Sequence, residues 1–319
     1  MKFETPSPQQ LPFGLRALHT VALVDGALSP EEAAVIAAAQ RLFGHQGEID
    51  GLAPVTPAEL AAAIEPPALR HQLFGGLVVM SMADGEVTPS EADLVGAFAE
   101  ALEVKDAAVA NLQRIAKGQL RRARLDILRR HWAPRKAREM AAERGPHIVG
   151  EALLGLLNVK SFPEVTMRYQ ALGEHPPGSL GRAYFDYMIQ NDFAFPGEKG
   201  APPEAMLFHD LTHVLSGYGT TPEEEILAAT FSAGYSNTEV INWLVFVLSQ
   251  FQLGLPTAPN VPPERLKLNP DRFLAALRRG AAMNIDINEG WDPWPVLGEP
   301  VEELRRRYNI LPEASFLPA

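Results

Sequence analysis

Two histidines four residues apart form the most informative chemical pattern in this sequence. His209 and His213 lie within residues 203–215, which begin with Pro-Glu and are followed by Gly217, so we expect a helix there. Residues at this spacing share one face of a helix, and their imidazoles can therefore bind one ion. The sequence predicts a metal site on this helix.

Two carboxylates could complete that site. Asp210 follows His209 directly, where His-Glu-x-x-His metalloproteases carry a glutamate, and we interpret it as a ligand or as the proton-handling catalytic group. Thr221 predicts the start of a second helix with Glu224 as its capping-box partner, which leaves Glu225 to face the histidines across a helical hairpin. Nitrogen and oxygen ligands without any cysteine favour zinc, with iron or manganese as alternatives.

The spacing of these residues resembles the signature of the coenzyme Q biosynthesis protein 4 family. In that signature His209-Asp210-x-x-His213 is followed after eleven residues by Glu225. Two other segments are similar to the same family, PPGSLGRAYFDYM at 176–188 and WDPWPVLGEPVEELRRRYNI at 291–310. The resemblance extends over about residues 145–312.

This resemblance implies an all-helical domain that binds a divalent metal through the motif and associates peripherally with membranes. It further implies a polyprenylated quinone precursor or another isoprenoid lipid as ligand, and other quinone-biosynthesis proteins as partners. The implied activity is ubiquinone biosynthesis through metal-dependent, oxidative removal of a ring carboxyl group or hydroxylation at that position. On this basis we interpret Arg182 and Tyr184 as contacts of the substrate head group.

Two other functions stay open. The first is a non-enzymatic lipid-binding scaffold that organises quinone-biosynthesis enzymes around a structural metal. The second is metal-assisted hydrolysis, which depends only on the likeness to the metalloprotease motif. An open coordination position would distinguish a catalytic metal from a structural one.

The first hundred residues contain a duplicated unit. VALVDGALSPEEA matches ADGEVTPSEA and its preceding residues at an offset of 59, and each copy predicts a helix end at Asp-Gly followed by a capped helix. Too few spaced oxygen ligands are present for a calcium loop. The matched pairs are Asp25 and Asp84, Gly26 and Gly85, Ser29 and Thr88, Pro30 and Pro89, and Glu32 and Glu91. Residues 12–105 resemble the TerB-like (tellurite-resistance) helical family, which implies an interaction module.

Charge divides the chain into three parts. Residues 1–110 carry 5 basic and 15 acidic residues, 111–150 carry 11 and 3, and 151–319 carry 12 and 21, within a net charge of −11. We predict a basic linker helix over 111–145 that either braces the acidic flanks, adsorbs to anionic lipid with Trp132 at the interface, or binds RNA. Because the whole chain is acidic, we expect no nucleic-acid partner.

These patterns together predict an all-α protein of two helical domains. They are a TerB-like duplicated domain at 1–110 and, after the basic linker, a quinone-biosynthesis-type metal-binding domain at 146–319. The apolar segment 238–254 is too short to span a membrane and predicts either a buried core helix or the wall of a tunnel for an isoprenoid tail. We expect a cytoplasmic protein, held peripherally on the inner face of a membrane.

Overall fold

The fold is built from helices alone. The computed structural model describes residues 3–145, 150, 160–237, 240–258 and 261–317. Within these ranges no β-strand occurs, and the only β pairings are two isolated bridges, Ser179 with Pro300 and Leu253 with Arg265. The prediction of an all-α fold is therefore confirmed.

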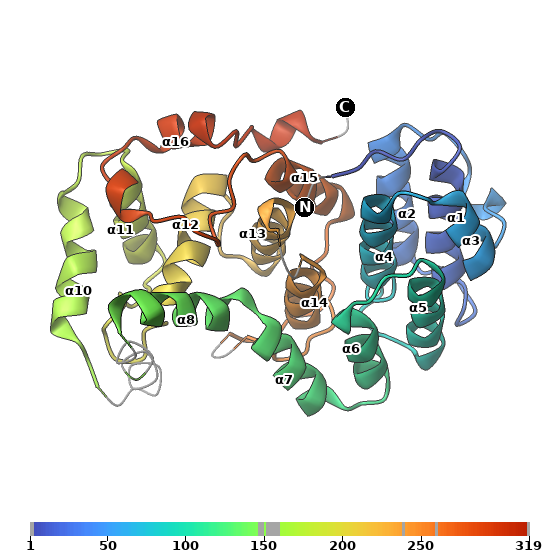
Figure 1. Cartoon of the computed structure of the whole chain (residues 1–319), viewed down its shortest axis with the longest axis horizontal. Helices are drawn as coiled ribbons and strands as arrows, with labels where there is room; N and C mark the ends of the chain where they lie inside the picture. Colours follow the sequence, from blue (N-terminus) through green and yellow to red (C-terminus); the bar gives the residue numbers. More distant parts are fainter. Residues whose placement is uncertain (1–2, 146–149, 151–159, 238–239, 259–260, 318–319) are drawn as a thin grey trace.

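The duplicated unit forms the bundle at the right of Figure 1. Its helices are α1 (Leu11–Ala22), α2 (Pro30–Phe43), α3 (Pro57–Ala63), α4 (Pro67–Met80) and α5 (Pro89–Ala101). Both predicted capping boxes are present: Ser29 with Glu32 opens α2, and Thr88 with Glu91 opens α5. A third box at the start of α3 was not predicted. In all three boxes the side chains satisfy backbone N–H groups that the helix itself leaves without partners.

The basic segment forms three helices, which corrects the prediction of a single linker helix over 111–145. These are α6 (Ala107–Ala116), α7 (Leu120–Arg130) and α8 (Trp132–Arg144). Gly118 takes a left-handed conformation between the first two, and His131 is extended between the second and third. The Trp132 side chain lies outside the described part of the structure.

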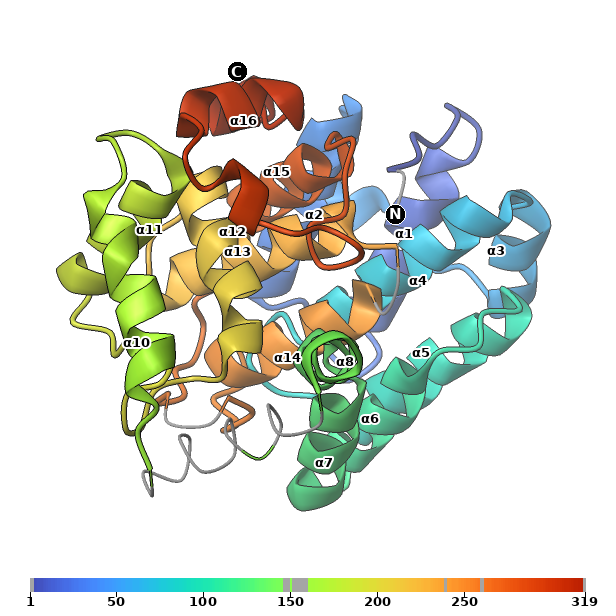
Figure 2. The same ribbon diagram turned by 60° about the vertical axis from the view of Figure 1, so that its left-hand side comes forward.

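The second half surrounds one helix that is buried after its first turn. Its helices are α10 (Pro163–Gln170), α11 (Leu180–Gln190), α12 (Leu207–Ser216), α13 (Pro222–Tyr235), α14 (Val240–Phe251), α15 (Pro270–Ala281) and α16 (Val301–Arg307). Every residue of α13 from Ile226 to Tyr235 is buried, and α13 and α14 lie near the centre of the molecule in Figures 1 and 2.

The apolar segment 238–254 contains α14, whose residues are all buried except Phe246. The buried-core interpretation is therefore confirmed for its described residues, and residues 238–239 lie outside them. Among the described helices, none is long and apolar enough to cross a bilayer.

Two glycines let α13 and α15 cross at backbone contact. A Cβ atom on Gly234 would overlap the carbonyl oxygen of Leu277, and one on Gly280 would overlap that of Phe231. Only a residue without a side chain fits there. This crossing positions the first turn of α13, which carries Glu225.

The duplicated unit and the second half share one continuous hydrophobic core. Arg41 on α2 makes a two-pronged ion pair with Asp271 on α15, at 2.8 and 3.0 Å. The second repeat turn is also covered, because Gln252 donates to the carbonyl of Ala83 and Arg265 donates to that of Gly85 at 2.7 Å. The equivalent first turn, at residues 24–27, is exposed.

Candidate metal centre

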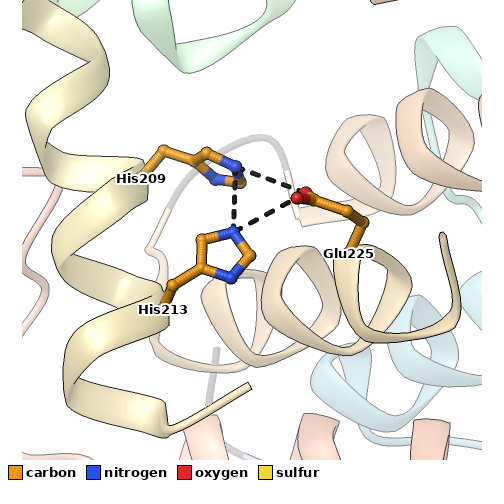
Figure 3. A group of neighbouring side chains, drawn as sticks. All are labelled: His209, His213 and Glu225. Carbon is orange, nitrogen blue, oxygen red and sulfur yellow. Dashed lines mark hydrogen bonds and ion pairs between the residues drawn. The ribbon is translucent and has the colours of Figure 1, made fainter. Parts of the chain in front are cut away.

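Three side chains from two helices converge on one point, as Figure 3 shows. The Nε2 atoms of His209 and His213 are 3.2 Å apart, and Oε2 of Glu225 lies 3.4 Å from the first and 3.6 Å from the second. His213 is fully buried, and the other two are partly buried. Within the described residues, this is the one His/Asp/Glu group arranged to hold a metal ion.

The hairpin between α12 and α13 creates this convergence. Gly217 ends α12 in the left-handed conformation that favours glycine, and the side chain of Thr221 accepts a hydrogen bond from the backbone of Glu224 to start α13. The chain therefore reverses within a few residues, and Glu225 returns to the level of His213. The sequence predicted this arrangement of helices.

Glu224 differs from its predicted role. Its carboxylate does not close a capping box on Thr221 but accepts from the backbone N–H of Gly219 and pairs with Arg272 of α15 at 3.3 Å. The same arginine holds Glu223 at 3.1 Å. These contacts hold the start of α13 against the preceding turn and against α15. They thereby fix the position of Glu225 relative to the two histidines.

A hydrogen bond fixes the orientation of the His213 ring. Its Nδ1 lies 3.1 Å from the carbonyl oxygen of Tyr218, and because a carbonyl only accepts, this contact assigns a proton to Nδ1. Nε2 then turns toward the carboxylate of Glu225. A lone pair and a carboxylate at this distance need a cation between them, which is either a second proton on an imidazole or a metal ion.

The three separations fit a tetrahedral metal ion. Ligand atoms about 2.0–2.1 Å from tetrahedral zinc lie about 3.3–3.4 Å from one another. The observed separations of 3.2, 3.4 and 3.6 Å match that triangle without any movement of a helix. Three protein ligands of this kind leave one coordination position for a water or a ligand.

The electrostatics of the cluster suit a bound cation. Burial alone would favour neutral forms, but the Glu225 carboxylate raises the pKa of His213 above its usual value. In return, and against the effect of burial, the two imidazoles hold the pKa of Glu225 well below its usual range. The carboxylate is therefore ionised and ready to bind a positive charge.

Asp210, the predicted fourth ligand, is not a member of this three-residue group. Adjacent residues of a helix differ by about 100° in direction, so Asp210 cannot share the face of its neighbour His209. Its side chain is buried and lines the same cavity as the cluster. Burial raises the pKa of Asp210 to about 6, against the opposite effect of the two histidines. Its role as proton-handling group stays a prediction.

The two residues predicted to contact a head group do not line this cavity. Arg182 pairs with Asp186 at 2.8 Å and donates to the carbonyl of Gly173. Tyr184 is fully buried against Tyr169, and its hydroxyl has no hydrogen-bond partner among the described residues. Their proposed contact with a substrate is therefore untested, and the structure gives no support for it.

Two cavity residues were missed from the sequence. Tyr187 stacks on the His213 ring, with the ring centroids 5.6 Å apart. His131 packs against Trp243 and against Phe246, and its ring centroid is 4.4 Å from that of Phe246. Tyr187 follows the predicted Tyr184 by three residues on α11, so helical spacing could have identified it. His131 comes from the basic segment, and nothing in its local sequence indicates that it meets this site.

The cluster opens into a large cavity with mostly apolar walls. Its volume is about 980 Å³, and His209, Asp210 and Glu225 lie in its wall. The remaining walls come from α7, α8, α11, α13 and α14, from the start of α10, and from the segments that follow α11 and α14. Apolar lining residues from these elements are Leu128, Met140, Phe162, Met188, Phe193, Trp243, Phe246, Val247 and Phe251.

The chain was compared with known protein families, curated proteins and solved structures, and none of these comparisons gave a match.

Proposed function

We propose that this protein binds one divalent metal ion, zinc first among the candidates, and uses it to modify a polyprenylated aromatic quinone precursor. The observation that carries the proposal is the His209/His213/Glu225 cluster, which borders a mostly apolar cavity of about 980 Å³ with His209 and Glu225 in the cavity wall. An aromatic head group could place an oxygen at the cluster while its isoprenoid chain lies along the apolar walls. Such burial contributes about 0.8 kcal/mol per CH₂ group.

The proposed reaction is removal of the ring carboxyl group as CO₂, with a proton taking its place on the ring. The related alternative, hydroxylation at that position, would need dioxygen as oxidant. A bound ion would supply Lewis-acid polarisation of a carboxylate or phenolate oxygen. Asp210, buried in the same cavity with its pKa raised to about 6 by that burial, is suited to hold or deliver a proton at the ring. The apolar walls would exclude water from the ring.

A lipid-binding scaffold with a structural metal is the second candidate. In its favour, the cavity-lining residues all lie at Leu128 or later, so the duplicated unit contributes nothing to the described cavity and is free for an accessory role such as recruiting other quinone-biosynthesis proteins. Against it, a set of three protein ligands is typical of catalytic zinc, whereas structural zinc has four.

The test begins with tag-free protein and its metal content by mass spectrometry. We expect about one metal ion per chain, and we expect the His209→Ala/His213→Ala variant to lose it. A His45→Ala/His71→Ala variant, which removes two histidines from the duplicated unit, should keep it. Full metal occupancy in the first variant would refute the site.

The same preparations then separate the two functions. Extracted lipid is identified by mass spectrometry, and the protein is incubated with a polyprenylated hydroxybenzoate while release of CO₂ is followed. Turnover by the wild type but not by the metal-free variant supports the enzyme. Binding of the precursor without any turnover supports the scaffold.

A further inference from the structure

Helix α7 has two faces of different character. Its inner face holds Ala123, Asp126 and Ile127, and the carbonyl of Ile127 accepts a hydrogen bond from Asn242 of α14 at 3.3 Å. The opposite side, here called the outer face of α7, is exposed. It consists of Arg121, Arg122, Leu125 and Arg129, and Leu120, the first residue of the helix, is exposed as well. Leu125 is 68% exposed and Leu120 is 40% exposed, which is unusual for leucines on a helix that also has a buried side.

Acidic neighbours do not neutralise all of the positive charge on the outer face. Arg114, Arg129 and Arg130 all surround the buried carboxylate of Asp126, so three positive charges share one negative charge. For Arg121, Arg122 and the nearby Lys117, the described part of the chain offers no carboxylate within 4.0 Å. A positive, partly apolar surface thus persists on a protein whose net charge is −11.

Helix α7 also supplies a part of the cavity wall. In Figures 1 and 2, α7 occupies the lower edge of the molecule, and the segments that follow α11 (yellow) and α14 (orange) extend toward that edge. Those segments supply Phe193 and Val261, which line the cavity and are 41% and 42% exposed. Leu128 of α7 and His131 are lining residues as well. One helix therefore carries the exposed cationic surface and a part of the cavity wall.

We propose that the outer face of α7 docks on an anionic lipid bilayer. Its cations complement the phosphate groups of the lipids, and Leu125 enters the interface between head groups and acyl chains. Each cation near such a surface strengthens binding about fivefold. Because Leu128 of the same helix lines the cavity, docking holds the cavity close to the bilayer, where a lipid-tailed ligand can reach it. This last step rests on the proposed function, whereas the docking itself does not.

The experiment is cosedimentation of the full-length protein with vesicles. Vesicles of phosphatidylcholine with about one third phosphatidylglycerol are compared with pure phosphatidylcholine at low and at physiological salt. We expect binding only to the anionic vesicles, and we expect it to weaken as salt shortens the screening length from about 30 Å to about 8 Å.

Two pairs of variants test the surface itself. Arg121→Gln/Arg122→Gln should weaken binding by about 25-fold, since two cations are removed. Its control, Arg306→Gln/Arg307→Gln on α16, changes the net charge equally but should leave binding unchanged. Leu125→Ala should also weaken binding, while Leu311→Ala, which alters a leucine that is 41% exposed elsewhere, should not. Thermal melts check that each variant is folded.

Undiminished vesicle binding by Arg121→Gln/Arg122→Gln would overturn the proposal, and so would an equal loss in its charge-matched control. Failure of the wild type to bind either vesicle would overturn it as well, and would favour a protein partner for this surface. Metal content is measured on the same samples. Loss of vesicle binding with full metal content leaves the proposed function intact, and vesicle binding by a metal-free protein leaves the docking intact.

Discussion

Glu224 and Glu225 are identical side chains, one residue apart, that the start of α13 directs to different tasks. Glu224 points back to the backbone N–H of Gly219 and to Arg272, so its contacts are structural. Glu225 points to the two histidines. Successive residues of a helix point in directions about 100° apart. Glu224 therefore stabilises the start of the helix, while Glu225 faces the candidate metal site.

Alanine at each position should therefore have opposite consequences. We expect Glu224→Ala to cost about 1 kcal/mol of unfolding free energy and to keep the metal, because it removes a hydrogen bond and a partly exposed ion pair. We expect Glu225→Ala to lose most of the bound metal, because a charged ligand is removed. Urea unfolding and metal analysis on both variants measure the two effects. Loss of metal in Glu224→Ala but not in Glu225→Ala would show that Glu224, and not Glu225, is the ligand.

Among the elements, the capping boxes show how burial changes the meaning of one motif. In the Thr88 box, burial raises the pKa of Glu91 to about 7, although hydrogen bonds from Thr88 act in the other direction. In the Thr56 box the glutamate is exposed, and hydrogen bonds from Thr56 lower the pKa of Glu59. The same sequence device therefore favours a proton in one helix and an ionised carboxylate in the other.

The two boxes predict opposite pH dependences. Folded Glu91 keeps a proton that an unfolded glutamate, with a pKa of 4.5, releases, so its contribution to stability is complete below pH 4.5 and is lost as pH rises toward 7. The stability of the wild type relative to Glu91→Gln should fall across this window in urea titrations. Relative to Glu59→Gln it should instead rise with pH, since a lowered pKa stabilises the ionised fold. If the stability difference between wild type and variant changed with pH in the same direction for both variants, the opposite pKa shifts of Glu91 and Glu59 would be contradicted.

The crossing of α13 and α15 should be the least tolerant contact of the fold. Gly280→Ala places a methyl group onto the carbonyl of Phe231, so the helices must separate, and we expect a loss of about 3 kcal/mol or more. Gly76→Ala on α4 is the control, because its Cβ would meet only Leu18 at 3.7 Å. A helix-interior alanine there should stabilise by about 0.5–1 kcal/mol. Equal melting temperatures for both variants would show that the crossing can relax.

The local part of this architecture is predictable from the sequence, and the tertiary part is not. Helix starts at Ser29, Thr88 and Thr221 follow from capping chemistry, and the convergence of His209, His213 and Glu225 follows from helical spacing and a short turn. These signals act over a few residues. The partner that Glu224 finds in Arg272, and the arrival of His131 at the cavity, depend on how distant helices pack. No spacing rule encodes that packing.

For the whole molecule, the decisive feature is the core shared by the duplicated unit and the second half. Helix α14 contacts α4, α6 and α7 as well as α13, so it belongs to both parts. Arg41 with Asp271, and Arg265 with the Gly85 carbonyl, add polar contacts between the parts. The predicted boundaries at 110 and 145 stay predictions, since contacts of this kind do not exclude separately folding parts.

We expect a single unfolding transition for the full chain, because removing either part exposes core surface of the other. All four tryptophans lie at residue 132 or later, so their fluorescence reports on the basic segment and the second half and not on the duplicated unit. Hydrogen exchange of α1 and α4 reports on the duplicated unit. Midpoints in urea that coincide for the two probes support the shared core, and a separate earlier transition for α1 and α4 would contradict it.

The contacts of Gln252 and Arg265 with the second repeat turn also have a consequence during synthesis of the chain. Arg265, which closes that turn, is 180 residues later in sequence than the Gly85 that it binds. At about 5–20 residues per second, a ribosome needs roughly 10–40 s to supply it. During that interval the α4 surface that later meets α14 has no partner from its own chain. The nascent protein therefore presents an apolar face to the cell for tens of seconds, and this is the period in which a chaperone would be most useful to it.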